Sequence, residues 1–218
     1  YSSAEAYQLL NYSDQIRVSY CLRFLEIYEK LHTICTKEIP FKVSFKRSYY
    51  LPKWHPYADY RKEYTAQKVL GGGVIRTLSH EIDLAIHWFG QPKTTVGVVD
   101  KLSFLDIDTD DYAYFTFKTD DNVRVSFELD FYSPINVNIG EAFTPKGKYT
   151  WSMDSIKFCS YEDTIEETLY ATQDNHIHEM YKRQMIDFLG FINFQKSKNA
   201  TLKDSIEVLK LIEKVEKR

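Results

Sequence analysis

The spacing of apolar and polar residues predicts helices near both ends of the chain. Residues 2–12 open with a Ser-x-x-Glu capping box and continue as a short amphipathic helix. Residues 22–35 repeat apolar side chains at three- and four-residue intervals, which is the spacing of a helix face that packs on a core. The same spacing recurs over residues 74–89, 176–194 and 203–217, so we expect helices there as well.

Apolar residues that alternate with polar ones predict strands between these helices. Residues 41–49 alternate in this way, and Arg47 is the charged misfit on their apolar face. Further strands are expected over residues 94–104, 111–119 and 123–132, with shorter ones over residues 16–20, 136–143, 148–153, 155–159 and 165–170. This order of elements is that of an α+β fold, in which a large, mostly antiparallel open sheet has helices packed on one face.

The densest chemistry lies in residues 71–90, GGGVIRTLSHEIDLAIHWFG. Three glycines precede the predicted helix, so we expect their free N–H groups to form a site for an oxyanion or hydroxyl. They do not form the G-x-G-x-x-G pattern, and a dinucleotide site made by this chain alone is not expected. A polar stripe follows on one side of the helix, and it is either simply solvated or functional: Arg76, Thr77, His80, Asp83 and His87.

A long predicted loop over residues 51–69 precedes this helix and is interrupted by two prolines. Long loops inside compact domains are often functional. Trp54 and His55 suggest the wall of a pocket, because a Trp face suits the C–H surface of a sugar ring. Tyr60 and Arg61 would supply contacts to hydroxyl, phosphate or carboxylate groups. Packing under the loop is the alternative use of all four side chains.

Two segments carry a resemblance to a known family. Residues 51–90, LPKWHPYADYRKEYTAQKVLGGGVIRTLSHEIDLAIHWFG, and residues 18–24, VSYCLRF, resemble the glucose-fructose oxidoreductase, inositol dehydrogenase and MocA family. They are most similar to its branch with an LP-x-WHP-x-x-DYR segment, which often belongs to surface-polysaccharide biosynthesis. The resemblance implies a dihydrodipicolinate-reductase-like C-terminal domain over residues 22–218. Residues 1–21 would be the last helix and strand of a Rossmann domain that is otherwise largely absent, because the chain begins at Tyr1.

The resemblance also implies an activity and a set of site residues. Members of this family transfer a hydride between NAD or NADP and the hydroxyl of a sugar, sugar nucleotide or cyclitol. His80 falls on the family's catalytic histidine, which exchanges a proton with that hydroxyl, whereas Thr77 stands where the family has Asp or Glu. Asp83 and Thr77 would orient His80. Tyr20 and Arg23 would line the cofactor side, and the substrate contacts would be Trp54, His55, Tyr60, Arg61 and Arg76.

We expect this chain to bind no cofactor and to be inactive without its Rossmann domain. In the resembling family the exposed face of the sheet joins subunits, which implies a homodimer or homotetramer. The alternative is a non-catalytic binding or dimerisation module derived from such an enzyme, and Thr77 in place of an acid slightly favours it.

Composition excludes several classes of partner. The net charge of -3 and the pI near 6.1 give no support for nucleic acid or an acidic membrane as partner. The three cysteines are widely spaced, which indicates neither a disulfide framework nor a zinc site and fits a reducing cytoplasm. No leader peptide and no apolar run of roughly 20 residues is present, so we expect a cytoplasmic protein.

Histidine spacing does not predict a metal site. His176 and His178 point to different sides of a helix, whereas a metal pair needs a spacing of four residues. Asp174 or Asn175 is expected to cap that helix instead. The stripe of His80, Asp83 and His87 has ligand spacing too, but a catalytic histidine with an orienting acid is the preferred interpretation. We therefore expect no metal.

Overall fold

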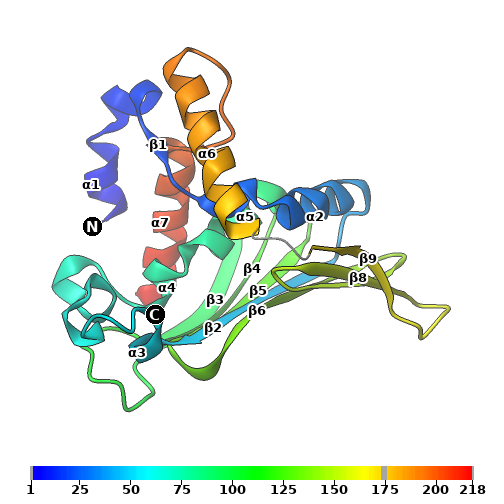
Figure 1. The fold of residues 1–218 in the computed structure, drawn as a ribbon, viewed down its shortest axis with the longest axis horizontal. Helices are drawn as coiled ribbons and strands as arrows, with labels where there is room; N and C mark the ends of the chain where they lie inside the picture. Colours follow the sequence, from blue (N-terminus) through cyan, green and yellow to red (C-terminus); the bar gives the residue numbers. More distant parts are fainter. Residues whose placement is uncertain (1, 173–175, 218) are drawn as a thin grey trace.

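The structure is a computed structural model that describes residues 2–172 and 176–217 (Figure 1). Within these residues eight strands form one sheet in the order β3-β4-β5-β2-β6-β7-β8-β9. β2 runs parallel to β5, and the other neighbours in the described sheet are antiparallel. The strands are β2 (Lys42–Tyr50), β3 (Thr94–Asp100), β4 (Tyr112–Lys118), β5 (Arg124–Asp130), β6 (Tyr132–Thr144), β7 (Gly147–Trp151), β8 (Ser155–Ser160) and β9 (Glu167–Ala171). The predicted α+β architecture is confirmed.

The larger helices lie on one side of this sheet, and Figure 1 shows the opposite side free of them. They are α2 (Glu26–Lys37), α5 (Ser79–Phe89), α6 (His176–Ile192) and α7 (Leu202–Glu216). The chain enters α7 through a capping box, in which the Thr201 hydroxyl accepts from the N–H of Asp204 and the Asp204 carboxylate accepts from the N–H of Thr201. The covered face of the sheet and the apolar stripes of the helices therefore share one core.

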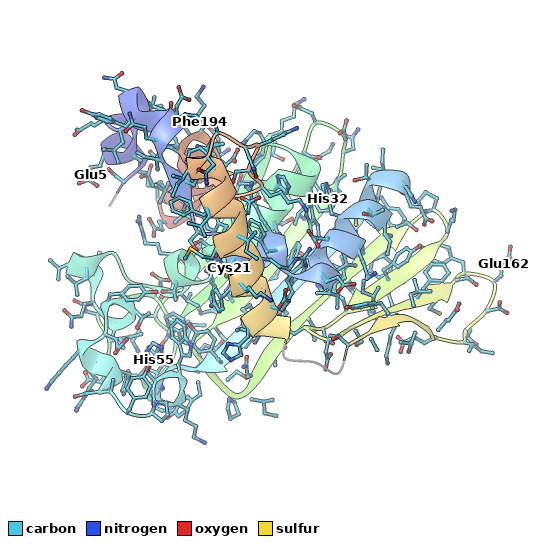
Figure 2. All side chains as sticks on the ribbon, turned by 45° about the horizontal axis from the view of Figure 1, so that its top comes forward. Glu5, Cys21, His32, His55, Glu162 and Phe194 are labelled. Carbon is cyan, nitrogen blue, oxygen red and sulfur yellow. The ribbon has the colours of Figure 1, made fainter. Side chains whose placement is uncertain are left out.

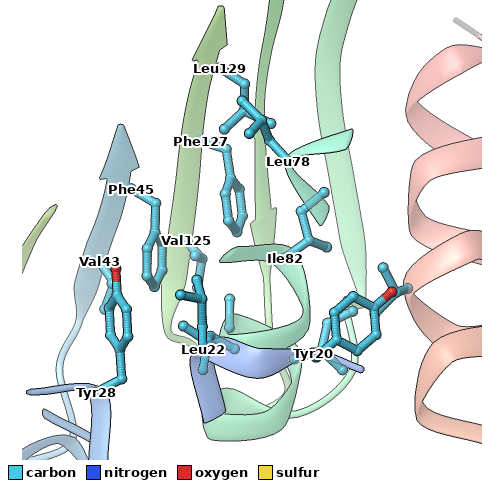
Figure 3. Close-up of a cluster of buried hydrophobic side chains, with 14 of the residues drawn as sticks. Tyr20, Leu22, Tyr28, Val43, Phe45, Leu78, Ile82, Val125, Phe127 and Leu129 are labelled. Carbon is cyan, nitrogen blue, oxygen red and sulfur yellow. The ribbon is translucent and has the colours of Figure 1, made fainter. Parts of the chain in front are cut away.

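Aromatic rings form the centre of that core (Figure 3). The ring of Phe127 stacks on Phe45 with centroids 5.3 Å apart and on Phe115 with centroids 4.6 Å apart. All three come from the covered face of neighbouring strands, because β2 pairs with β5 at Phe45 and β4 pairs with β5 at Phe115. Leu78 and Ile82 pack on this layer from the helix side and are buried.

The N-terminal segment packs on the C-terminal helix. α1 (Ser3–Tyr7) is attached to α7 because the N–H and hydroxyl of Ser3 donate to Glu213 at 2.6 and 2.7 Å. β1 (Arg17–Val18) pairs antiparallel with β10 (Ala200–Thr201). The predicted strand over residues 16–20 thus has a partner within this chain and is repacked. A 3-10 helix, η1 (Leu10–Gln15), takes the place of the second half of the predicted helix over residues 2–12.

Several predicted elements have different bounds in the structure. The helix predicted over residues 74–89 is split into α4 (Val74–Thr77) and α5, because Leu78 leaves helical geometry with φ -93° and ψ 32°. The helix predicted over residues 22–35 begins as the 3-10 helix η2 (Cys21–Phe24), and the extended Leu25 separates it from α2. The predicted loop over residues 51–69 contains short turns, which are α3 (Leu51–Trp54), η3 (Tyr60–Lys62), η4 (Tyr64–Ala66) and η5 (Lys68–Leu70).

The strand predicted over residues 94–104 ends at Asp100 for a local reason. The side chain of Asp111 accepts hydrogen bonds from the N–H groups of Leu102 and Ser103 and from the Ser103 hydroxyl. These bonds turn residues 101–103 away from the sheet.

The cysteines and the helices add two further observations. Cys21 and Cys35 are buried free thiols, and burial raises the pKa of Cys35 to about 12, so it is an unreactive core residue.

Among the described residues, none of the helices combines the length and apolarity that spanning a membrane requires.

We expect Phe127→Ala to lower the free energy of unfolding by about 3–5 kcal/mol, because it removes a fully buried ring and leaves a cavity between Phe45 and Phe115. Urea denaturation followed by circular dichroism measures the change. Phe104→Ala is the matched control, since that ring is 82% exposed, and it is expected to cost less than about 0.5 kcal/mol. Equal losses in the two variants would contradict the assigned core.

Candidate functional site

The imidazole of His80 packs against the ring of Tyr20. Tyr20 lies between β1 and η2, His80 lies in the first turn of α5, and their ring centroids are 5.5 Å apart at an interplanar angle of 89°. The Nδ1 atom of His80 is buried and has no hydrogen-bond partner among the described residues. Burial, with a smaller contribution from the positive charge of Arg47, lowers the pKa of His80 to about 4. The ring is therefore neutral at pH 7.

Arg47 and Glu81 form a polar pair beneath His80. Arg47 projects from β2, and its Nε lies 3.8 Å from Oε1 of Glu81, the residue after His80 on α5. Glu81 is buried, and burial raises the pKa of its carboxyl although Arg47 opposes this effect. The Arg47 guanidinium is fixed by hydrogen bonds from Nη1 to the Asn136 side chain at 2.8 Å and to the Val137 carbonyl at 3.3 Å. A fixed positive charge thus faces the first turn of α5.

Asp83 is paired with Arg23 and makes no hydrogen bond to His80. The guanidinium of Arg23 donates from Nε and Nη2 to the two carboxylate oxygens of Asp83 at 2.7 and 2.6 Å. Both side chains are buried, with 6% and 1% of their surface exposed. A second carboxylate, that of Asp204, lies 3.5 Å from Arg23. The pair fixes η2 on α5, and it consumes the donors that Arg23 would offer to a cofactor.

Thr77 and Arg76 are also directed away from His80. The hydroxyl oxygen of Thr77 is buried and lies beside Tyr64. Arg76 donates from Nε and Nη2 to the Glu216 carboxylate near the end of α7, both at 2.7 Å. The predicted polar stripe is therefore dispersed, because the break at Leu78 changes the helical register and each member meets a different element.

The three glycines do not form the predicted oxyanion site. The N–H groups of Gly71, Gly72 and Gly73 donate to the carbonyls of Lys68, Gln67 and Thr65. The next two N–H groups, those of Val74 and Ile75, donate to the backbone and side chain of Asp110. The expectation of free N–H groups is wrong, since a carboxylate from the same chain already occupies the helix start.

Aromatic rings form a row along the segment that follows β2. Trp54 lies 4.7 Å from Tyr49 and 4.9 Å from His55, and His55 stacks on Tyr57 at 5.6 Å, all measured between ring centroids. Nδ1 of His55 is 3.0 Å from a carboxylate oxygen of Glu63, which holds the ring in place. Trp54 is 40% exposed and Tyr57 is more so, and the row therefore presents aromatic surface to solvent. Aromatic surface suits the C–H groups of a sugar.

Tyr60 and Arg61 stabilise this segment. The Tyr60 hydroxyl accepts a hydrogen bond from the N–H of Asp106 at 3.2 Å. Arg61 donates to both carboxylate oxygens of Asp59, at 2.8 and 2.9 Å, and remains exposed. Arg61 is therefore accessible at the surface, whereas Tyr60 serves the loop.

Arg47 connects the aromatic row to His80. Its guanidinium lies 5.7 Å from the Tyr49 ring centroid, Tyr49 contacts Trp54, and the charge of Arg47 acts on His80. The sequence shows Arg47 as a charged residue on an apolar strand face, but that signal names no partner. Nothing in the sequence marks Glu81 as a residue of this site, because its burial depends on how α5 packs on the sheet.

The expected absence of a metal stays a prediction. Asp174 and Asn175, the expected helix cap, lie outside the described residues. Among the described residues no group of three or more His, Cys, Asp or Glu side chains is arranged to hold a metal ion.

Sequence comparison identifies a family, and structural comparison gives the fold. The family model "GFO/IDH/MocA C-terminal domain" matches residues 41–150. No curated protein sequence matches the chain significantly.

Solved structures share the fold at low identity. UDP-N-acetylglucosamine 3-dehydrogenase from Acidithiobacillus ferrooxidans matches with a TM-score of 0.75 and 13% identity over 98% of this chain and 66% of that chain. An inositol dehydrogenase homolog from Azotobacter vinelandii, complexed with NAD+, matches with a TM-score of 0.80 and 10% identity over 98% and 66%. An aldose-aldose oxidoreductase from Caulobacter crescentus, complexed with glycerol, matches with a TM-score of 0.80 and 14% identity over 98% and 65%. The chain thus spans about two thirds of their length.

We expect Asp110→Asn to stabilise the protein at neutral pH. Burial raises the pKa of Asp110 from 3.8 to about 6, so the folded state binds this proton more tightly than the unfolded state. The contribution of Asp110 to stability is then most favourable below pH 4 and is lost as the pH rises toward 6. Asparagine does not ionise and therefore avoids this loss. The free energy of unfolding of the variant is expected to be about 1–2 kcal/mol higher than that of the wild type at pH 7.5.

Urea denaturation at pH 7.5 and pH 4.5 measures the difference in the free energy of unfolding between the Asp110→Asn variant and the wild type. This difference is expected to be smaller at the lower pH. Asp121→Asn, in the exposed turn between β4 and β5, is the control and is expected to change little at either pH. A variant at position 110 that is less stable than wild type at pH 7.5 would show that the bond from the Ile75 N–H outweighs desolvation.

Proposed function

Because the chain belongs to the GFO/IDH/MocA family, we propose that it is the substrate-binding and oligomerising part of an NAD(P)-dependent oxidoreductase. The proposed substrate is the hydroxyl of a sugar, sugar nucleotide or cyclitol. The observation that carries the proposal is the contact between His80 and Tyr20, in which a neutral imidazole has a buried Nδ1 atom without a partner among the described residues. The printed names of the similar structures, which include a sugar-nucleotide dehydrogenase and an inositol dehydrogenase homolog, support the substrate class.

His80 is proposed to exchange the proton of the reacting hydroxyl. A neutral imidazole can accept the proton of an alcohol during its oxidation. A nicotinamide cofactor, when bound, would accept the hydride from the same carbon. Arg23 and Asp83 are proposed as positioning residues, since their ion pair holds Tyr20 and η2 against α5.

The cofactor is proposed to bind mainly to a separate nucleotide-binding domain. The glycine N–H groups of residues 71–73 all have backbone partners, so they do not fit a pyrophosphate. Residues 1–21 are proposed as the end of such a domain and residues 22–218 as the C-terminal domain. Tyr20 would then form the border of the cofactor site. Burial and the nearby Asp83 raise the pKa of its hydroxyl to about 12, so it acts as a neutral group.

The substrate is proposed to lie along the aromatic row. Trp54 and His55 would contact its ring with the parts of their side chains that remain exposed, and the exposed Arg61 would reach a phosphate or carboxylate at the rim. Tyr60 would act indirectly by holding the loop. Arg76 is left out of this set, because its Nε and Nη2 both donate to Glu216 on α7.

The open face of the sheet is proposed to join subunits in a homodimer or homotetramer. Several large apolar side chains on the sheet are exposed, among them Val96, Val98, Tyr114, Ile139 and Leu169. A groove of about 480 Å³ lies over β2, β5, β6 and β7, with Ile139, Tyr114 and Lys46 among its lining residues. Apolar surface of this kind favours a protein partner.

A non-catalytic module is the second candidate, and one observation favours it. Neither Thr77 nor Asp83 makes a hydrogen bond to His80 among the described residues, so no side chain fixes the tautomer of the imidazole. A module of this kind would keep the sheet and the subunit contacts without the chemistry.

In the complete enzyme we expect His80→Gln to lower kcat about 100-fold or more, with a smaller effect on KM, because it removes the proton acceptor and keeps the volume. Reduction of NAD or NADP at 340 nm, with UDP-sugars, aldoses and myo-inositol as substrates, measures the rate. His178→Gln is the matched control, since that residue is exposed on α6. Full activity of the His80 variant would exclude the proposed role, and no turnover of any hydroxyl substrate by the wild type would favour the non-catalytic module.

We expect the 218-residue chain alone not to bind NAD or NADP with micromolar affinity, because its described residues form a mostly antiparallel sheet and no dinucleotide fold. Isothermal titration calorimetry with each cofactor measures this. Binding of either cofactor at micromolar concentration would contradict the assignment of the nucleotide site to a separate domain.

A further inference from the structure

Two histidines from different helices lie side by side at some distance from the aromatic row. His32 belongs to α2 and His87 to the last turn of α5, and their ring centroids are 5.3 Å apart with an interplanar angle of 47°. Figure 2 shows His32 on α2 and His55 on the 51–70 segment, on opposite sides of α6 in that view. The pair is therefore separate from the proposed substrate site.

The two rings line a cavity of about 590 Å³ between α2, α5 and residues 197–204. The charged side chains around them already have partners. Glu29 pairs with Arg183 at 2.6 Å and with Lys198 at 2.9 Å, and Asp204 caps α7. By contrast, the rings of His32 and His87 make no hydrogen bond to any of the described residues.

The ring of His32 also packs on the residue that follows His87 on α5. His32 stacks on Trp88 with an interplanar angle of 5° and a centroid distance of 5.9 Å. Imidazole binds metal ions through a ring nitrogen that carries no proton.

The separation of the rings fits a shared ion. A Zn²⁺-like ion lies about 2.0–2.1 Å from an imidazole nitrogen and hence about 3.2 Å from the ring centroid, so two rings on one tetrahedral ion have centroids about 5.2 Å apart. The observed centroid distance of 5.3 Å is compatible with this spacing. The cavity around the rings has room for water molecules as further ligands.

We propose that His32 and His87 form a two-histidine site for a divalent transition-metal ion of the Zn²⁺, Ni²⁺ or Cu²⁺ class, which would bridge α2 and α5. Nitrogen ligands select this class over Mg²⁺ and Ca²⁺. The described residues contain no cluster of three or more ligating side chains, so water completes the coordination. The bridge would tie α2 to the helix that carries His80.

Calorimetric titration of the untagged 218-residue chain with Zn²⁺ and with Ni²⁺ at pH 7.5 tests the site. We expect one ion per chain, and we expect His32→Gln and His87→Gln each to weaken binding at least about tenfold. Circular dichroism confirms that the variants fold, which is expected because His87 is exposed. Mg²⁺ is expected to give no binding. In NMR spectra, sub-stoichiometric Cu²⁺ should broaden the ring-proton signals of His32 and His87 before those of the other histidines.

The His176→Gln/His178→Gln double variant is the matched control, since these two histidines are the other close pair in the sequence. Binding that is unchanged in both single variants, or that disappears in the double variant, would overturn the proposal. So would the absence of saturable Zn²⁺ and Ni²⁺ binding up to about 1 mM. None of these measurements depends on enzymatic activity, so the outcome is independent of the proposed oxidoreductase function.

Discussion

The buried ion pair between Arg23 and Asp83 is the contact on which the arrangement of the site depends. Two parallel hydrogen bonds join the segment that follows β1 to the middle of α5, and almost none of either side chain reaches solvent. Desolvating two charges offsets much of their attraction, so such a pair contributes more to geometry than to net stability. Its geometric effect is specific: with Arg23 fixed on Asp83, the ring of Tyr20 meets His80 one turn earlier on the same helix. A lysine in place of Arg23 would keep the charge and lose the planar, two-bond match.

A second constraint acts on α5 from the sheet side. Glu81 is turned toward the core, where Arg47 from β2 approaches it, and His80 beside it experiences the same positive charge. A buried carboxylate without a cation would be costly, and a protonated imidazole next to a guanidinium would be repelled. The positive charge of Arg47 therefore favours the ionised form of Glu81 and the neutral form of His80. Its own position is set by Asn136 and the Val137 carbonyl on β6, so the sheet fixes a charge that adds to the effect of burial on His80.

Periodicity in the sequence predicts the fold class because it reports which face of an element is buried. The alternation over β5 and the apolar stripe of α7 both reappear as burial patterns. Contacts between distant residues are different, because helical spacing tells where a side chain points and not what it meets. The expected partner of Asp83 is His80, three residues earlier in the sequence, but its observed hydrogen-bond partner is Arg23, which is sixty residues earlier. Asp110 fills the helix start at Ile75 and Glu216 receives Arg76, and neither partner is marked by any local pattern. Arg47 stands out in the sequence as a charged residue on the apolar face of a strand, but nothing in the sequence identifies its partners.

The position of β2 in the sheet has a consequence for how the chain reaches its native state. β2 lies between β5 and β6, and its residues pair with partners about eighty to one hundred positions later, Lys42 with Arg124 on one side and with Phe143 on the other. Both edges of this apolar strand stay open until those partners have been synthesised and have arrived. Sheets closed by such distant pairings form slowly, because the entropy of a long loop is lost before the contacts are gained. A nascent chain released before residue 144 would expose an unpaired strand, so ribosomal stalling in this interval favours aggregation.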